Sequence, residues 1–336
     1  MKKLGYISIG LTVFSAFFFS CSEEVILDEL KTESVSISFS VDPITKAEGE
    51  NGSVDAEPQE VQIKNYYVGI FKDSNGEPSG LITNYSEERI SKDNGGVISV
   101  NDLIVPTGEP VHILVIANSP DISKYKGYTS YQEFSNVVYA EYSNLVGDLI
   151  KVGQTEHTFT VDNTTAKVDL KQLTSKIRVK LYLQEEGNTT AVWQFSPAPK
   201  VSVSGIMLQS PLIINDAETS TVTEPTTKDT ELSCTLTGNE IGFGFYTFQK
   251  KDMAKAPITV TVNGNLLNTK TGQSVSNVTY KIVINRNSVV STDGILAGGY
   301  YEATGTLKVS PNVDATVEWV VVELEKVEDV EIPPFE

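Results

Sequence analysis

Apolar and polar residues alternate along most of this chain, which is the pattern of β-strands that bury one face. The clearest run is residues 34–41, where serines occupy one face and apolar residues occupy the other: Val35, Ile37, Phe39 and Val41. Residues 111–117 are almost entirely apolar and predict a strand that is buried on both faces. Similar runs span residues 61–71, 176–183, 201–208, 258–262, 280–284, 300–309 and 315–324. Short strands spaced this evenly predict an all-β fold made of β-sandwiches.

One segment departs from the alternation. Ser130 and Glu133 fit a capping box, in which each side chain can satisfy a backbone N–H group of the other residue. Apolar residues recur at helical spacing around them: Tyr131, Phe134, Val137 and Val138. This pattern predicts one short helix in the N-terminal part of the fold.

A polar turn at residues 161–165 separates two series of predicted strands. Domain boundaries fall in polar segments of this kind, so we expect a boundary near residue 165. The predicted division is an N-terminal β-sandwich at residues 47–165 and a C-terminal β-sandwich at residues 166–314. A last strand and tail follow at residues 315–336.

The first residues have the organisation of a lipoprotein signal peptide. Two lysines precede the apolar stretch 4–19, which is short for a membrane span. Ser20 and then Cys21 follow it, so we predict a signal peptide at residues 1–20 and lipid attachment at Cys21. An ordinary signal peptide with a chance cysteine is the alternative. Since Cys234 is the only other cysteine, we expect no disulfide and a small apolar role for Cys234 in packing.

Charge and composition argue against several classes of function. Asp and Glu number 44 against 26 Lys and Arg, so the formal net charge is −18 and the chain should repel nucleic acid. His112 and His157 are the only histidines, and no His/Cys cluster has metal-ligand spacing. Motifs for a nucleophile elbow, a phosphate loop or a zinc protease are absent from the sequence. We therefore expect no metal, no cofactor, no nucleic-acid partner and no enzymatic activity.

Several motifs stand in a characteristic order along nearly the whole chain. After the signal and the first alternating strand come residues 44–47 (ITKA), 63–71 (IKNYYVGIF), 113–120 (ILVIANSP), 170–179 (LKQLTSKIRV) and 300–307 (YYEATGTL). This order resembles the fimbrillin family, the FimA/Mfa-like subunits of type V pili. Within it, residues 44–47 resemble the family's Thr-Arg-Ala processing site, with Lys46 in place of arginine. The chain departs from the family at residues 298–299, where two glycines replace a frequent Arg-Asn pair.

The resemblance implies two tandem, transthyretin-like β-sandwich domains and a structural subunit of a cell-surface pilus that supports adhesion. It implies a precursor that is lipid-anchored in the cell outer membrane. A trypsin-like surface protease would cut between Lys46 and Ala47 and remove the propeptide, residues 21–46, together with the first strand. The groove left behind would receive the C-terminal strand of another copy or of a related pilin, and repetition would build the fimbrium.

The residues permit this exchange physically. Burial of the four apolar side chains of the removed strand represents roughly 6–12 kcal/mol, and an apolar groove with unpaired edges is an association site. The donor would be the C-terminal segment, whose apolar positions are Val320, Val322, Leu324, Val327, Val330 and Ile332.

A tip or minor fimbrial adhesin, or a glycan-binding surface lipoprotein, is the alternative function. The observation behind it is the supply of 14 tyrosines, several of them in residues 125–142. Aromatic rings such as those of Tyr128 and Tyr131 can form platforms for sugars, although tyrosine is also an ordinary strand residue.

Overall fold

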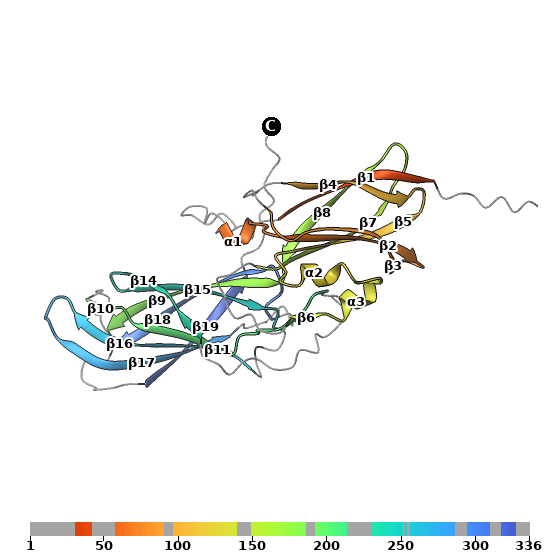
Figure 1. The fold of residues 1–336 in the computed structure, drawn as a ribbon. Coiled ribbons are helices and arrows are strands. Elements are labelled where there is room, and N and C mark those ends of the chain that lie inside the picture. The colour runs from red at the N-terminus through yellow and green to blue at the C-terminus, as the bar shows by residue number, and fades with distance from the viewer. Residues whose placement is uncertain are drawn as a thin grey trace, which may run out of the picture. The chain divides into compact units, whose positions relative to one another are not determined.

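The computed structural model describes residues 31–41, 58–90, 97–139, 149–185, 192–213, 230–250, 253, 256–285, 294–309 and 317–326. The strands described belong to the unit Thr32–Glu336. Strands account for most of the described residues (Figure 1), so the predicted all-β fold class is confirmed.

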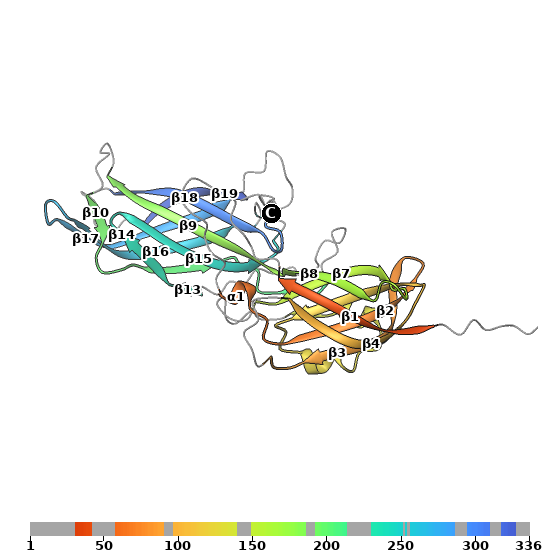
Figure 2. The ribbon, with the colours of Figure 1, turned by 90° about the horizontal axis from the view of Figure 1, so that it is seen from above.

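The first sheet has the strand order β3-β2-β5-β7-β8-β1-β4. Neighbouring strands run antiparallel except β1 and β8, which run parallel. Figure 2 shows β1 lying beside β4 and β8. The strands are β1 (Thr32–Val41), β2 (Tyr66–Ser74), β3 (Glu77–Glu87), β4 (Ile98–Pro106), β5 (Pro110–Ala117), β7 (Lys151–Thr158) and β8 (Thr165–Gln172).

The second sheet has the order β13-β11-β16-β17-β19-β18-β9-β15-β14, and β10 also pairs with β16. Its strands are β9 (Thr174–Glu185), β10 (Trp193–Phe195), β11 (Lys200–Ser204), β13 (Thr230–Leu232), β14 (Cys234–Thr237), β15 (Glu240–Phe248), β16 (Ile258–Asn268), β17 (Ser274–Asn285), β18 (Tyr300–Val309) and β19 (Val317–Lys326). A small third sheet joins β6 (Val138–Tyr139) to β12 (Ser210–Pro211).

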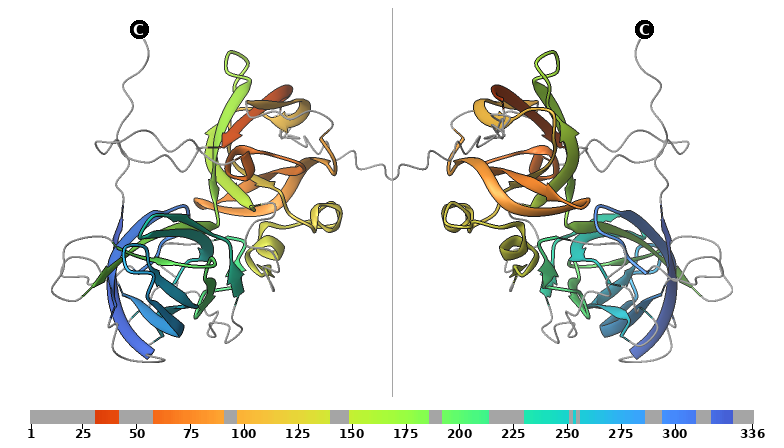
Figure 3. Two further views of the ribbon diagram at one scale, coloured as in Figure 1. Left: turned by 90° about the vertical axis from the view of Figure 1, so that its left-hand side faces the viewer. Right: turned by 90° about the vertical axis from the view of Figure 1, so that its right-hand side faces the viewer.

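Both large sheets fold over their own buried faces, as the end-on views of Figure 3 show. In the first sheet the two edge strands, β3 and β4, contact each other. In the second sheet β10 contacts β9, and β13 contacts β15. Each sheet therefore encloses a hydrophobic core of its own.

In the described part of the chain, three short helices accompany the sheets: α1 (Pro58–Val61), α2 (Ile122–Tyr125) and α3 (Tyr131–Ser135). The helix predicted from the capping box is α3, but it ends at Ser135, and Val138, which is expected to continue the helical spacing, lies in β6. The Glu133 carboxylate accepts the N–H groups of Thr129 and Ser130 at 2.7 and 3.0 Å, and these bonds, that of Thr129 first, hold the pKa of Glu133 below its usual value. The sequence gives no sign of α1 and α2 because a single turn is too short to show helical periodicity.

The strand predicted from residue 61 begins only at Tyr66. The side chain of Asn118 bonds with two groups of the preceding backbone. This side chain accepts the Lys64 N–H at 2.8 Å and donates to the Gln62 carbonyl at 2.8 Å. A side chain more than 50 residues away therefore helps to hold the backbone that leads into the strand.

Strand β5 is buried on both faces, as its apolar sequence predicts. Val111, Ile113 and Val115 face the core of the first sheet. Leu114 and Ile116 face a third cluster, to which α2, α3 and the segments around Leu173, Met207 and Phe248 contribute.

The chain passes from the first sheet to the second at Leu173, between β8 and β9. Strand β8 thus follows the polar turn at residues 161–165 and still belongs to the first sheet. The division into two domains near residue 165 stays a prediction. Cys234 is a free, half-buried cysteine that packs against the core of the second sheet, and burial raises the pKa of its thiol.

Candidate strand-exchange site

Strand β1 is inserted between two strands that are distant in the sequence. It runs antiparallel to β4, with Val35 opposite Leu103 and Ile37 opposite Val100. It runs parallel to β8, with Phe39 opposite Val168. Because β1 connects β4 to the rest of the sheet, removing it would open the ladder on both of its sides.

The side chains of β1 that face inward fill the core of the first sheet. Val35, Ile37 and Phe39 are fully buried, whereas Val41 is partly buried at the edge of the same cluster. The ring of Phe39 meets the ring of Tyr66 edge to face, with 5.0 Å between centroids. The predicted apolar face of this strand is therefore an inner face of the fold.

Strand β4 carries an irregularity opposite β1. The register shifts between Val35 and Ile37, where an advance of two residues along β1 corresponds to an advance of three residues along β4. Asp102 sits in this bulge with φ 61°, in the left-handed region that asparagine and aspartate tolerate. Among the described residues, β1 is the only strand that pairs with β4.

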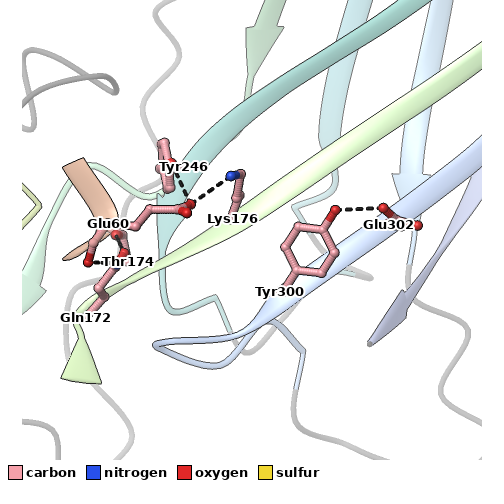
Figure 4. Close-up of polar contacts among 7 residues, drawn as sticks. All are labelled: Glu60, Gln172, Thr174, Lys176, Tyr246, Tyr300 and Glu302. Atoms are coloured by element: carbon pink, nitrogen blue, oxygen red, sulfur yellow. Dashed lines mark hydrogen bonds and ion pairs between the residues drawn. The ribbon is translucent and has the colours of Figure 1, made fainter. Parts of the chain in front are cut away.

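The segment that follows the predicted cleavage site is held by buried polar contacts. Helix α1 begins at Pro58, and the carboxylate of Glu60 lies 2.8 Å from the ammonium of Lys176 in β9 (Figure 4). The Tyr246 hydroxyl of β15 donates to the same carboxylate at 2.8 Å, and the Gln172 side chain donates to the Glu60 carbonyl at 2.9 Å. Glu60 is 1% exposed, so this ion pair lies in the interior.

A second buried cation fixes the next residues. The Lys151 ammonium donates to the carbonyls of Leu149 and Gln62 at 2.9 and 3.2 Å. Lys151 itself is fully buried. The chain from Pro58 onward is thus tied to β7, β8, β9 and β15 by contacts that do not involve β1.

Strand β19 occupies an equivalent position in the second sheet. It runs parallel to β17, with Val320 opposite Ile282 and Val322 opposite Ile284. It runs antiparallel to β18, with Leu324 opposite Ala303. Like β1, it has one parallel and one antiparallel neighbour, so the two strands satisfy the same pattern of backbone pairing.

Several predicted site residues lie outside the described part of the chain. They are the lipidation residue Cys21, the processing residues Lys46 and Ala47, and the tail residues Val327, Val330 and Ile332. Their roles stay predictions, as does the donor role of β19.

The two tyrosines that suggested a sugar platform take part in packing. Tyr128 and Phe134 meet with 4.8 Å between ring centroids, and Tyr131 meets Phe71 at 5.4 Å. Both tyrosines are partly buried against the third core cluster. Their rings serve the packing of α3 against β2.

Within the described ranges, no group of His, Cys, Asp and Glu is arranged to hold a metal ion. No helix in that part of the chain has the length and apolarity needed to cross a membrane.

Sequence reasoning missed Glu60 and the bulge at Asp102. Glu60 stands in a polar stretch where an acid is unremarkable, and its partners Lys176 and Tyr246 are more than 100 residues away. The bulge leaves one trace in the sequence: the apolar positions of β4 step from Ile98 and Val100 to Leu103 and Val105, which breaks the alternation once.

The two folded-over sheets, with β1 and β19 inserted in the same manner, place the protein in the class of all-β proteins with two large sheets. Residues 34–196 match the family described as major fimbrial subunit protein (FimA). The resemblance to the fimbrillins is therefore confirmed. No curated protein sequence matches the chain.

Solved structures share the fold. A candidate cell adhesion protein from Parabacteroides distasonis has a TM-score of 0.59 at 15% identity, covering 87% of this chain and 96% of that one. A fimbrial assembly protein from the same species has a TM-score of 0.50 at 18% identity, covering 83% and 93%. The tip fimbrial protein Mfa3 from Porphyromonas gingivalis, with a C-terminal truncation, has a TM-score of 0.54 at 10% identity, covering 88% and 98%.

Proposed function

We propose that this protein is a structural subunit of a cell-surface pilus that polymerises by strand exchange. It is exported as a lipoprotein modified at Cys21 and anchored in the cell outer membrane. A trypsin-like surface protease cuts between Lys46 and Ala47 and releases residues 21–46 with β1. The C-terminal segment of a second copy, or of a related pilin, then fills the groove.

The observation that carries this proposal is the position of β1. A strand near the chain start pairs on both sides and contributes Val35, Ile37 and Phe39 to the core, yet only residues 42–57 connect it to α1. One cut in that connection separates β1 covalently from everything that follows. The match to a fimbrial subunit family supports the reading of such a cut as maturation.

Energetics favour refilling of the groove once β1 has left. Three fully buried apolar side chains account for about 5–9 kcal/mol of burial. The departure also leaves backbone groups of β4 and β8 unpaired at two facing edges, and such edges take up an added strand. An exposed groove of this kind is therefore an association site with a defined occupant, an apolar strand.

Residues 58–65 are attached to the rest of the fold by contacts that do not depend on β1. Because Glu60 and the Gln62 carbonyl are held by Lys176, Tyr246 and Lys151, the new N-terminal region stays attached to the fold after the cut. Removal of β1 therefore does not release the segment that follows it.

Controlled proteolysis of the delipidated precursor tests the proposal. Three forms are compared: the natural sequence, Lys46→Ala, and the matched control Lys31→Ala, since a cut after Lys31 would leave β1 in place. We expect trypsin-like protease to produce a new N-terminus at Ala47 and a ladder of oligomers on unheated gels for the natural sequence and for Lys31→Ala. Lys46→Ala should stay uncut there and monomeric. Ladder formation by uncut Lys46→Ala, or clean cutting at Lys46 without any ladder, would contradict the proposal.

A tip or minor subunit is the second candidate, and the position of β19 favours it. This strand is paired on both sides within its own sheet, so withdrawing it would divide that sheet between β17 and β18. A subunit that keeps β19 in place can accept a strand without donating one, and it would end a fibre. Its fold is shared by the tip protein Mfa3. Immunogold labelling of isolated fibres distinguishes the two candidates. Labels along the fibre indicate a shaft subunit, and labels only at fibre ends indicate a tip subunit.

A further inference from the structure

Strand β16 loses regular pairing on both of its sides at the same place. On one side β10 ends at Phe195 and β11 starts at Lys200, so the connecting loop stands opposite Gly264 and Asn265. On the other side the register with β17 shifts directly after Gly264. The coincidence of these two irregularities opens a hollow in the sheet that has a volume of about 320 Å³.

Two unusual backbone positions lie at the hollow. A Cβ atom added to Gly264 would lie 2.7 Å from the ring of Phe195, so only glycine fits there. Asn277, in the bulge of β17, has φ 57°, and bulges of this kind redirect a side chain away from its regular position. Both Gly264 and Asn277 line the hollow.

The side chains around the hollow offer hydrogen-bond donors. The side-chain amide oxygen of Asn263 accepts the Thr279 hydroxyl at 2.6 Å, and the side-chain amide oxygen of Asn265 accepts the Asn277 backbone N–H at 2.9 Å. These bonds orient both amides and leave their NH₂ groups without a partner among the described residues. The exposed ammonium of Lys200 adds the one charge among the residues that line the hollow.

We infer that this hollow binds a terminal acidic sugar of a glycan, such as a uronic or sialic acid. Amide NH₂ groups donate to sugar hydroxyls and ring oxygens, and a lysine ammonium pairs with a carboxylate. The volume is at the lower end of the range for small-ligand sites and fits one sugar unit. The residues that line the hollow lie in β11, β16, β17 and the loop before β11, so the inference does not use the proposed acceptor groove of β1.

A glycan array probed with the full precursor tests the inference. It should carry chains that end in uronic or sialic acids beside the same chains ending in neutral sugars. We expect saturable binding to the acidic set. Absence of saturable binding, or equal binding to both sets, would overturn the inference.

Two variants test whether the sugar binds at the hollow. Asn277→Gly keeps the positive φ, which glycine tolerates, and removes the side-chain amide of a third asparagine that lines the hollow. Lys200→Met removes the charge and keeps the length of the side chain. Each should weaken binding of the acidic sugar about tenfold, the effect of one lost hydrogen bond or charge contact. The matched control is Lys270→Met, in the exposed turn between β16 and β17, which should bind normally.

Thermal unfolding of each variant first establishes that the fold is retained. Binding that is unchanged in both Asn277→Gly and Lys200→Met, or an equal loss in Lys270→Met, would overturn the assignment to this hollow. Oligomer ladders of the same variants should be normal, so failure of this inference and failure of strand exchange are distinguishable.

Discussion

At the scale of single residues, the most informative contacts are the buried polar ones around α1. Glu60 pairs with Lys176 in the interior, whereas Glu88 pairs with Lys126 on the surface at the same distance of 2.8 Å. Side-chain exposure differs widely, 1% for Glu60 against 58% for Glu88. The two ion pairs therefore have the same length, but their loss should affect stability differently, because a charge left unpaired in the interior has no water to solvate it.

Replacement of Glu60 by glutamine should destabilise the protein strongly. Glutamine retains an oxygen that can accept from Tyr246, but it removes the negative charge beside the buried Lys176 ammonium. We expect the free energy of unfolding to fall by about 3–5 kcal/mol. Glu88→Gln is the matched control and should cost about 1 kcal/mol or less. Denaturant unfolding measures both, and equal effects of the two substitutions would contradict this account.

Asp73 provides a pH-dependent contact at the β2–β3 turn. The His112 side chain lies 2.8 Å from its carboxylate, and the Gly76 N–H donates to it at 3.1 Å. These hydrogen bonds, that of His112 first, hold the pKa of Asp73 below its ordinary value. A carboxyl group with a lowered folded-state pKa stabilises the protein above its unfolded-state pKa, and this stabilisation disappears as pH falls through the folded-state pKa.

Asp73→Asn should therefore lower stability at neutral pH, and the difference from the natural protein should disappear in acid. Unfolding titrations between about pH 7 and pH 2 measure this, because that window spans the ordinary aspartate pKa and lower values. The exposed Asp162→Asn serves as the control. A difference that stays constant over the whole window would show that the Asp73 carboxylate has no such role.

At the scale of secondary-structure elements, β4 depends on β1. Strand β5 pairs with β2 and β7, whereas β4 pairs with β1 alone among the described strands. Loss of β1 thus leaves β5 intact and deprives β4 of its strand partner.

Hydrogen exchange should reveal this dependence. In the subunit cut after Lys46 and freed of residues 21–46, amides of β4 that face β1 should exchange rapidly, while those of β5 stay protected as an internal control. Protection of β4 should return in the polymer, when a donor strand is in place. Unchanged protection of β4 in the cut monomer would contradict the idea that β1 leaves an open groove.

Much of the element level follows from periodicity. Alternation locates β1 and the long strands of the second sheet, and the continuous apolar run of β5 correctly predicts burial on both faces. Periodicity does not reveal which strands are neighbours. The parallel pairing of β1 with β8 joins segments separated by more than 120 residues, and no local pattern encodes it. The start of β2 likewise depends on the distant Asn118.

The candidate site is predictable to a similar extent. The inward positions Val35, Ile37 and Phe39 can be identified from the sequence because the serines between them mark the other face. The contacts of Glu60 and the hollow at Gly264 cannot, because each forms only when several strands are assembled.

At the scale of the whole molecule, the proposed acceptance and the proposed donation of a strand involve different parts of the chain. The proposed acceptor groove lies in the first sheet, whereas the proposed donor segment continues from β19 into residues 327–336. A variant that ends after Lys326 should be cut normally at Lys46 and should accept a strand, but it should not donate one. When cut alone it should remain monomeric, and when mixed with the natural subunit it should shorten the ladder. Long ladders from the truncated subunit alone would place the donor elsewhere.

The most direct test of the central claim is the mass of the subunit N-terminus in fibres isolated from native cells. The account predicts a subunit that starts at Ala47 and lacks β1. Fibre subunits that start at a lipid-modified Cys21, or at any position that retains residues 32–41, would contradict polymerisation by replacement of β1.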